Sequence, residues 1–231
     1  MLLQDKVILI TGANGGLGNS VTNAFLEAGA RVIGVSRAIK DADFPNASFS
    51  GLAAGLTNAQ DARAIVDGAI ARAGRVDGLV HLIGGFAGGT PVADTDDATF
   101  ERMIDMNLRS AFLMIRAALP HMRAQGGGRI LAIGSKSAAE PSPKAAVYAA
   151  SKAALVSLIR SVARETRGQG ITANIVLPGT MDTPANRAAD PGADPSKWVR
   201  PRQVADLLVH LASDRGSQIN GAVIPIYGAE A

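Results

Sequence analysis

The sequence KVILITGANGGLG, residues Lys6–Gly18, decides the fold of this chain. Its first part, Lys6–Thr11, is a short apolar run rich in β-branched residues and without alternation. Such a run is typical of a strand buried on both faces of a parallel sheet. A glycine-rich turn follows, then a helical pattern that stops at Gly29, and then a second apolar run, RVIGVS (Arg31–Ser36). Strand, glycine-rich turn, helix and strand together predict a βαβ unit.

The glycine-rich turn Thr11–Gly18 opens the helix of this unit. Free N–H groups and the helix dipole at such an N-terminus favour a pyrophosphate, and glycines let the backbone approach it closely. The spacing is G-x-x-x-G-x-G rather than the G-x-G-x-x-G fingerprint. A glycine-rich turn alone is often only a tight turn, but its place after the first strand of a βαβ unit predicts dinucleotide binding.

Strand-like and helix-like segments alternate along the rest of the chain, with no linker or repeat to divide it. This alternation predicts one α/β domain over residues 1–231, a doubly wound parallel sheet with helices on both faces. Ligands bind such sheets at the carboxyl ends of the strands. Pro178–Pro201 is the longest segment without clear periodicity, and we expect it to form a lid over the site. The other predicted strands lie in Ala47–Leu56, Gly78–Ile83, Arg129–Ser135, Thr172–Leu177 and Ala222–Ile226, and the other predicted helices are Ala59–Ala73, Thr99–Met122, Ala145–Arg167 and Gln203–Ser213.

Composition argues against several classes of site. The chain has no cysteine, and His81, His121 and His210 lack ligand spacing, so we expect neither a disulfide nor a metal site. The net charge is +3, but Lys and Arg are scattered and aromatic residues make up only 4%, which gives little support for nucleic-acid binding. The apolar runs are strand-sized and the N-terminus runs directly into a strand. We therefore expect no membrane span, no signal peptide and a cytoplasmic protein.

Tyr148 and Lys152 are four residues apart in a predicted helix, so both side chains project from one face. A phenol normally titrates near pKa 10, roughly three units above neutral pH, and a nearby ammonium lowers that pKa. Such a pair is a proton donor and acceptor usable at neutral pH. Tyr and Lys at this spacing also occur by chance on many helices, so the pair alone does not establish catalysis.

Five features in this order resemble the short-chain dehydrogenase/reductase family over nearly the whole chain. They are TGANGGLG at Thr11–Gly18, Asn107 in the middle helix, Ser135 after the fifth strand, Tyr148-x-x-x-Lys152 thirteen residues later, and Pro178-Gly179 after the sixth strand. The resemblance implies a Rossmann fold with a seven-stranded parallel sheet that binds NAD(H) or NADP(H). It also implies a small-molecule substrate and a homo-oligomer, either a tetramer or a dimer.

The resemblance implies a role for each of four catalytic residues. Tyr148 would be the general acid in carbonyl reduction and the base in alcohol oxidation, and Lys152 would lower its pKa and bind the nicotinamide ribose. Ser135 would donate to the substrate oxygen, and Asn107 would hold a water that links Lys152 to solvent. Taken alone, Ser135 could equally cap a strand end and Asn107 could be a helix-interior amide.

Two positions depart from the family pattern. His81-Leu82-Ile83-Gly84 replaces the usual Asn-Asn-Ala-Gly after the fourth strand, and we expect the His81 ring to brace the central sheet as the first Asn normally does. Gly55 stands where an Asp usually holds the adenine, so backbone groups or Leu56 would have to substitute for that side chain.

The end of the second strand predicts which cofactor is preferred. An acid there takes the ribose 2′-hydroxyl, whereas an Arg takes a 2′-phosphate. Ser36-Arg37 stands there without an acid, and Lys40 follows, which favours NADP(H) over NAD(H). Against this, Gly15 replaces a second Arg found in many NADP(H)-dependent members, and Arg37 could be only a solvated loop charge. The residues expected to bind cofactor are Gly12, Asn14, Gly15, Gly16, Leu17, Gly18, Ser36, Arg37, Leu56, Gly84, Gly85, Tyr148, Lys152, Pro178, Gly179 and Thr180.

Two loops are similar to those of quinonoid dihydropteridine reductase: Gly84–Gly89, and Leu177–Arg187 with Trp198 further on. That enzyme lacks the serine present here as Ser135, so the likeness indicates kinship more than a shared substrate. Arg187 and Trp198 are candidates for substrate contact, and Trp198 is equally a candidate for packing within the lid.

The sequence therefore predicts an NADP(H)-dependent oxidoreductase that transfers a hydride between the nicotinamide and a carbonyl or secondary alcohol carbon. Two alternatives remain open at this point. One is a dihydropteridine reductase-like activity, and the other is a cofactor-binding protein without turnover. Intact Ser135, Tyr148 and Lys152 argue against the second alternative, because a protein that only binds a cofactor needs no proton donor.

Overall fold

A parallel sheet of seven strands forms the centre of the computed structural model, which describes residues 1–230. The strand order is β3-β2-β1-β4-β5-β6-β7, so the direction of winding reverses between β1 and β4. Crevices at such a reversal are where doubly wound sheets bind ligands. The strands are β1 (Val7–Thr11), β2 (Arg31–Ser36), β3 (Phe49–Ala53), β4 (Gly78–His81), β5 (Gly128–Ile133), β6 (Ile171–Pro178) and β7 (Val223–Ile226).

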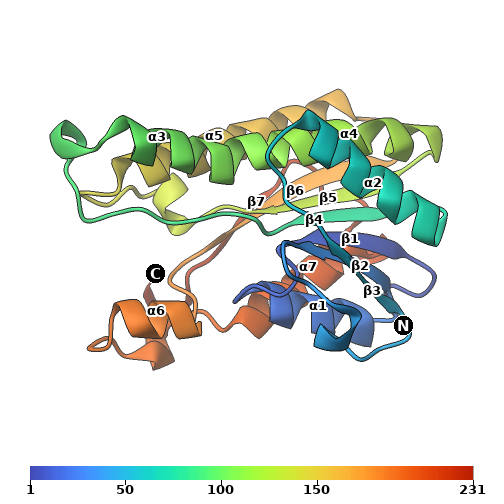
Figure 1. Cartoon of the computed structure of the whole chain (residues 1–231), viewed down its shortest axis with the longest axis horizontal. Coiled ribbons are helices and arrows are strands. Elements are labelled where there is room, and N and C mark those ends of the chain that lie inside the picture. Colours follow the sequence, from blue (N-terminus) through green and yellow to red (C-terminus); the bar gives the residue numbers. More distant parts are fainter. Residues whose placement is uncertain (231) are drawn as a thin grey trace.

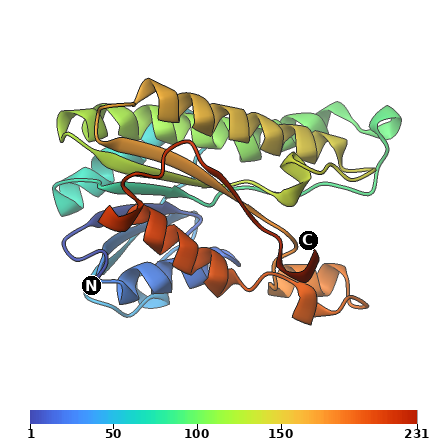
Figure 2. The ribbon, with the colours of Figure 1, turned by 180° about the vertical axis from the view of Figure 1, so that it is seen from behind.

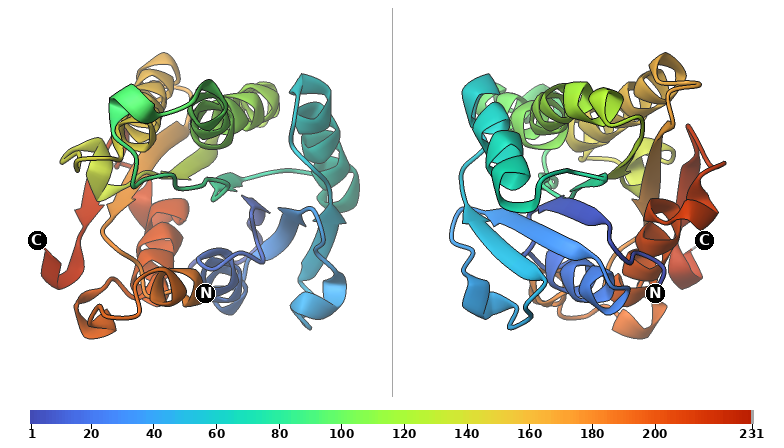
Figure 3. Two further views of the ribbon diagram at one scale, coloured as in Figure 1. Left: turned by 60° about the vertical axis from the view of Figure 1, so that its left-hand side comes forward. Right: turned by 90° about the vertical axis from the view of Figure 1, so that its right-hand side faces the viewer.

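Helices cover both faces of the sheet, which confirms the predicted doubly wound α/β fold (Figures 1 and 3). One face carries α2, α4 and α5, with α3 beyond them, and the other carries α1 and α7. Each layer buries its own apolar cluster against the sheet, because the strands are apolar on both faces. The helices are α1 (Gly18–Glu27), α2 (Ala59–Ala73), α3 (Asp97–Ile104), α4 (Ser110–Ala124), α5 (Ala146–Glu165), α6 (Pro184–Ala189) and α7 (Pro201–Ala212).

The helix predicted over Thr99–Met122 is present without a break, but it is not α-helical throughout. A π-helical turn, Asp105–Arg109, separates α3 from α4 and carries Asn107 on its inner side, where that residue is fully buried. A π turn costs regular helical hydrogen bonding and is often found at functional sites. The periodicity of apolar residues did not reveal this interruption, because both halves continue the same helical pattern.

The predicted lid, residues 178–201, has secondary structure of its own. Thr183 caps α6 by accepting a hydrogen bond from Asn186 N, and Pro184 occupies its first turn. A backbone bridge joins Met181 to Val199 and closes the base of the segment. The C-terminal segment after β7 lies beside it (Figure 2). A lid role for this segment stays a prediction.

Helix α5 is long and apolar enough, by length and composition, to cross a membrane. However, Leu155, Ile159 and Val162 on this helix pack into the core against the sheet. A core helix passes the same test, so this is weak evidence for a span. The expectations of no membrane contact and of a cytoplasmic protein stay predictions.

Candidate active site

The carboxyl ends of the strands bring the predicted site residues to one edge of the sheet. Gly12 follows β1, Gly84 lies beyond β4, Ser135 follows β5, and Pro178 ends β6. Parallel strands all end at the same edge, so residues far apart in the sequence meet there.

Two positions in the turn between β1 and α1, Gly12 and Gly18, accept only glycine. Gly12 has a φ of +71°, a left-handed conformation that favours glycine. A Cβ atom on Gly18 would lie 2.0 Å from the Gly12 carbonyl oxygen. These two glycines therefore set the tight turn and the close packing of α1 on the strand.

The same turn leaves the N-terminus of α1 open to an anion. Leu17 occupies the N-cap position without a side-chain cap, and the first turn contains no acid. Asn19 Nδ2 donates to the carbonyl oxygens of Asn14 and Gly15, at 3.1 and 3.2 Å. Because Asn19 of α1 binds these two carbonyl oxygens, the turn has the shape and the backbone N–H donors that a pyrophosphate requires.

The predicted residue Asn14 has a partner that the sequence did not suggest. Its Nδ2 donates to Asp43 Oδ2 at 3.2 Å, and the same carboxylate oxygen accepts from Lys40 N at 3.1 Å. Arg37 is exposed after β2, and Ser36 at the strand end is half-buried. The end of β2 therefore carries two exposed cations, Arg37 and Lys40, and two acids beside them, Asp41 and Asp43, which both accept hydrogen bonds from the protein.

Gly55 stands where the family usually carries an adenine-binding Asp, and the space beside its Cα is empty. A Cβ atom there would have no neighbour within 4 Å. Leu56 is half-buried and packs against the core beside α2. The structure thus offers space and an apolar side chain at this position rather than a carboxylate.

Lys152 points inward from α5. Its Nζ donates to the Ile133 carbonyl oxygen at 3.0 Å, and only 5% of the residue is exposed. Burial lowers the pKa of the ammonium to about 8. This contact fixes the ammonium between α5 and the end of β5.

Tyr148 lies one turn before Lys152 and is half-buried. Burial raises the pKa of the phenol, and hydrogen bonding to the Ser135 side chain opposes this rise to a smaller extent. Desolvation is therefore the larger effect on this pKa, and Lys152 does not produce the lowering that the sequence led us to expect. Ser135 Oγ also accepts from Ser137 N at 3.1 Å, which orients the hydroxyl toward the site.

Asn107 pins the loop after β4. Its Oδ1 accepts from Gly85 N at 2.9 Å, and its Nδ2 donates to Gly85 O and to Ser151 Oγ, each at 3.0 Å. A Cβ atom on Gly84 would lie 2.9 Å from Asn107 Oδ1 and 3.1 Å from Lys152 Nζ. The two polar side chains thus converge on the Cα of Gly84, where only glycine leaves both in place.

His81 braces the centre of the sheet, as the sequence predicted. Its Nδ1 lies 3.0 Å from Thr11 Oγ1 and its Nε2 lies 3.0 Å from Ser110 Oγ. The Ser110 hydroxyl donates to the Met106 carbonyl, so it accepts from His81 Nε2–H and the ring is neutral. Burial, with a smaller contribution from the charge of Lys152, lowers the pKa of this ring to about 3.

The lid places its two candidate substrate residues differently from the sequence hypothesis. Arg187 forms a two-point ion pair with Asp182, with Nη2 and Oδ2 2.9 Å apart. Trp198 is buried, which favours the packing alternative. Gly179 N donates to Ile226 O, and Thr180 O accepts from Val199 N, so both belong to the base of the lid.

The lid also touches the glycine-rich turn. A Cβ atom on Gly16 would lie 3.4 Å from Thr183 Cγ2. Thr183, which caps α6, therefore lies next to the glycine-rich turn.

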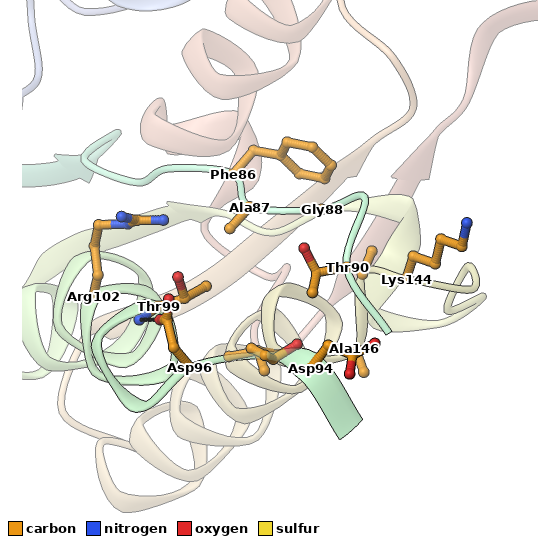
Figure 4. Close-up of a pocket in the computed structure, with 13 residues that line it drawn as sticks. Phe86, Ala87, Gly88, Thr90, Asp94, Asp96, Thr99, Arg102, Lys144 and Ala146 are labelled. Atoms are coloured by element: carbon orange, nitrogen blue, oxygen red, sulfur yellow. Dashed lines mark hydrogen bonds between the residues drawn. The ribbon is translucent and has the colours of Figure 1, made fainter. Parts of the chain in front are cut away.

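Phe86 lies in the loop Gly84–Gly89, which the sequence analysis singled out, and its ring reaches the site. Its ring meets that of Tyr148 edge to face, with centroids 5.0 Å apart and planes at 76°. A cavity of about 370 Å³ adjoins it, between the loop after β4 and the first turns of α3 and α5 (Figure 4).

The residues present fit a nicotinamide dinucleotide. The cradle at Gly12 and Gly18, the uncapped start of α1 and the bare Cα of Gly84 are places that added side-chain atoms would fill. No cluster of metal-ligating side chains occurs in the part of the chain that the structure describes. The arrangement thus combines a backbone cradle that fits the cofactor with hydroxyl groups and a buried ammonium.

Comparison with known proteins agrees with this geometry. Residues 6–194 match the family model described as short chain dehydrogenase. The chain is 33% identical to the short chain dehydrogenase adrF of Penicillium roqueforti, over 99% of this chain and 98% of that protein. It is 30% identical to the 3-oxoacyl-[acyl-carrier-protein] reductase FabG of Salmonella typhimurium, over 99% and 98%.

Solved structures give the same result. A 3-ketoacyl-(acyl-carrier-protein) reductase from Brucella melitensis, crystallised with NADH, superposes with a TM-score of 0.87 at 27% identity, covering 98% of both chains. A short-chain dehydrogenase/reductase from Serratia marcescens has a TM-score of 0.90 at 30% identity, covering 100% of both. This chain belongs to the short-chain dehydrogenase/reductase family of NAD(P)-dependent oxidoreductases.

Proposed function

We propose that the protein is an NADP(H)-dependent carbonyl reductase and alcohol dehydrogenase with Tyr148 as its general acid and base. The observation that carries this proposal is that Ser135 lies at the Tyr148 hydroxyl, while Lys152, one helical turn further on, reaches the bare Cα of Gly84. In reduction, a hydride reaches the carbonyl carbon and the Tyr148 hydroxyl gives its proton to the oxygen. Oxidation of the alcohol runs through the same atoms in reverse.

The bound nicotinamide supplies the hydride, and the chain holds the cofactor and moves the proton. The turn Gly12–Gly18 would hold the pyrophosphate, and Lys152 would hold the nicotinamide ribose. Gly84, Gly85 and the segment Pro178–Thr180 would border the nicotinamide.

Ser135 and Tyr148 would both donate to the same substrate oxygen. Ser135 Oγ accepts from Ser137 N, so its own hydrogen is available for donation. Burial keeps the Tyr148 phenol protonated at neutral pH, which suits donation to a carbonyl. Asn107 would act by fixing Gly85, because both of its amide hydrogens are already engaged by protein atoms.

The preference for NADP(H) rests on charge at the end of β2. Arg37 and Lys40 are exposed there, and the nearby Asp43 is occupied by Asn14 and Lys40 N. Two cations favour a 2′-phosphate over a 2′-hydroxyl.

Replacing Tyr148 with Phe tests the function directly. The purified protein is first titrated with NADPH by fluorescence and then given ketones, quinones and quinonoid dihydropterin. We expect ketone reduction by the wild type and a loss of about a hundredfold or more in kcat for Tyr148→Phe, with unchanged NADPH binding. Retained activity in the variant would rule out the proposed role of Tyr148. Turnover of quinonoid dihydropterin alone would instead support a pteridine reductase.

We further propose that the protein is a homo-oligomer, a tetramer or a dimer. Phe112 on α4 is 43% exposed and lies under the Arg116 guanidinium, and Ala153 and Ser157 leave the outer face of α5 flat. Light scattering of the purified chain gives its mass in solution, and a monomer would contradict this proposal.

A further inference from the structure

Phe86 presents most of its ring to solvent directly beside the proposed proton donor. The residue is 69% exposed, yet it stands edge to face with Tyr148. An exposed phenyl ring forgoes the free energy of burial, which a ligand packed against it would recover. Val92, on the same loop, is equally exposed but lies outside the cavity.

The loop holds the ring in place. Phe86 folds back over its own chain, so that a Cβ atom on Gly88 would lie 2.5 Å from the ring. Gly89 N donates to Lys144 O at 2.9 Å, and Lys144 takes a left-handed φ of +62° just before α5. The aromatic ring and the helix of Tyr148 are therefore tied to each other through the backbone.

The cavity below this loop is large enough for one ring-sized group. Its volume of about 370 Å³ lies at the lower end of the range of small-molecule sites. Figure 4 shows Phe86 on the side opposite Asp94 and Asp96, with the Ala87 methyl directed into the cavity. The Thr90 hydroxyl also points inward and has no hydrogen-bond partner among residues 1–230.

The charges around the cavity balance. Asp94 and Asp96 oppose Arg102 and Lys144, and Asp96 is already engaged in capping α3 through Thr99 N. A charged ligand would be attracted by one pair of side chains and repelled by the other. A neutral group would meet no net electrostatic repulsion.

We propose that Phe86 and this cavity form the subsite for a neutral, ring-bearing substituent of the substrate carbonyl. The substrate class is an aryl ketone, or the matching secondary alcohol, whose ring packs on Phe86 while its oxygen faces Tyr148. A ring substituent carrying oxygen would meet the Thr90 hydroxyl. This inference rests on the proposed function, because it assigns a substrate class to the same site.

Two variants and one control test the subsite. Phe86→Ala removes the aromatic surface, and Ala87→Leu fills the cavity without touching Tyr148. Each is expected to raise the KM for acetophenone about tenfold while changing kcat/KM for 2-butanone by less than about twofold. Val92→Ala removes an equally exposed apolar side chain outside the cavity. It should leave the KM for acetophenone and the kcat/KM for 2-butanone unchanged.

Phe86 also contacts Tyr148, so its loss affects both the subsite and the proton donor. The pH profile of kcat separates these two roles. Equal losses for both ketones in Phe86→Ala, with a shifted pH profile of kcat, would mean that Phe86 only supports Tyr148, and would overturn the inference. An unchanged KM for acetophenone in either variant would overturn it as well.

A binding measurement separates this inference from the proposed function. Calorimetry follows 1-phenylethanol as it binds to the NADPH complex, in which no reaction is possible. If the wild type reduces no ketone, the proposed function fails, and binding that weakens about tenfold in both variants still supports the subsite. Absent binding, or binding equal in all variants, would overturn the subsite.

Discussion

At the carboxyl ends of β1 and β2 the site is built from backbone, whereas at β4, β5 and α5 it is built from buried polar side chains. The first region depends on the absence of side-chain atoms at Gly12 and Gly18. The second depends on buried polar side chains whose hydrogen bonds are made within the protein, as those of Lys152, Asn107 and His81 are. The first region should therefore be damaged by adding atoms, and the second by removing hydrogen-bonding groups.

The largest effect should come from removing the ammonium of Lys152. We expect Lys152→Met to lower kcat/KM about a thousandfold, since the proton donor loses its charged neighbour. Its free energy of unfolding should stay equal or rise, because a buried charge is costly and only the Ile133 carbonyl loses a donor. Steady-state kinetics and urea denaturation measure the two quantities.

Lys6→Met is the control for this prediction. Lys6 pairs with Asp214 at the other edge of the sheet, away from the site. A loss of activity below about tenfold in Lys152→Met would show that the second region does not depend on this side chain.

Adding a single methyl group to the first region tests it in turn. In Gly18→Ala the new Cβ would meet the Gly12 carbonyl oxygen at 2.0 Å, so the turn must open. We expect destabilisation of about 3 kcal/mol and weakened cofactor binding. Gly55→Ala is the matched control, because its Cβ would find open space. Equal urea midpoints for the two variants would contradict a close-packed turn.

His81 gives the second region a pH dependence that the first lacks. Its pKa is about 3 in the folded chain, against an ordinary value of 6.5, so protonation favours the unfolded chain. The stability due to the neutral ring is complete above pH 6.5 and is lost as the pH falls toward 3, by up to about 1.4 kcal/mol per pH unit.

Replacing His81 with Asn should make the free energy of unfolding depend less on pH between pH 7 and 5, a range that includes the ordinary histidine pKa of about 6.5. Urea denaturation at several pH values measures this slope. His210→Asn, at an exposed position on α7, is the control variant. Identical slopes in the wild type and His81→Asn would show that the imidazole is not the group responsible.

The smallest effect concerns the end of β2, where the first region does use side chains. Arg37→Ala should weaken NADPH binding about tenfold and change NADH binding by less than about twofold, because a solvent-exposed charge acts only on the 2′-phosphate. Fluorescence titration measures both constants, and the exposed Arg215 provides a control. Tighter binding of NADH by the wild type would refute the assignment of Arg37.

The backbone-built region was the easier one to predict from the sequence. Its determinants, from Thr11 to Gly18, are contiguous, and Gly12 and Gly18 each have a local steric reason. The Asn14–Asp43 contact escaped prediction because it joins residues 29 positions apart. Short α6 was missed because six residues give too little periodicity, although Thr183-Pro184 is a start signal for a helix.

In the side-chain region, residue identities were predictable but their partners were not. The bracing role of His81 followed from its place after β4, and its two hydrogen bonds confirm it. The attachment of Lys152 to Ile133 depends on the distance between α5 and the sheet, which no local pattern encodes. The same is true of burial, which decides the direction of the Tyr148 pKa shift.

The π turn Asp105–Arg109 sets the rotational phase between α3 and α4. Each residue of a helix turns the chain by about 100°, so deleting one residue here would rotate α3 and its loop relative to α4. Asn107 would then leave Gly85, and the loop carrying Phe86 would turn away from Tyr148. Chain length in these five residues is thus as constrained as their chemistry, whereas the exposed turn at Gly192 has no such phase to keep.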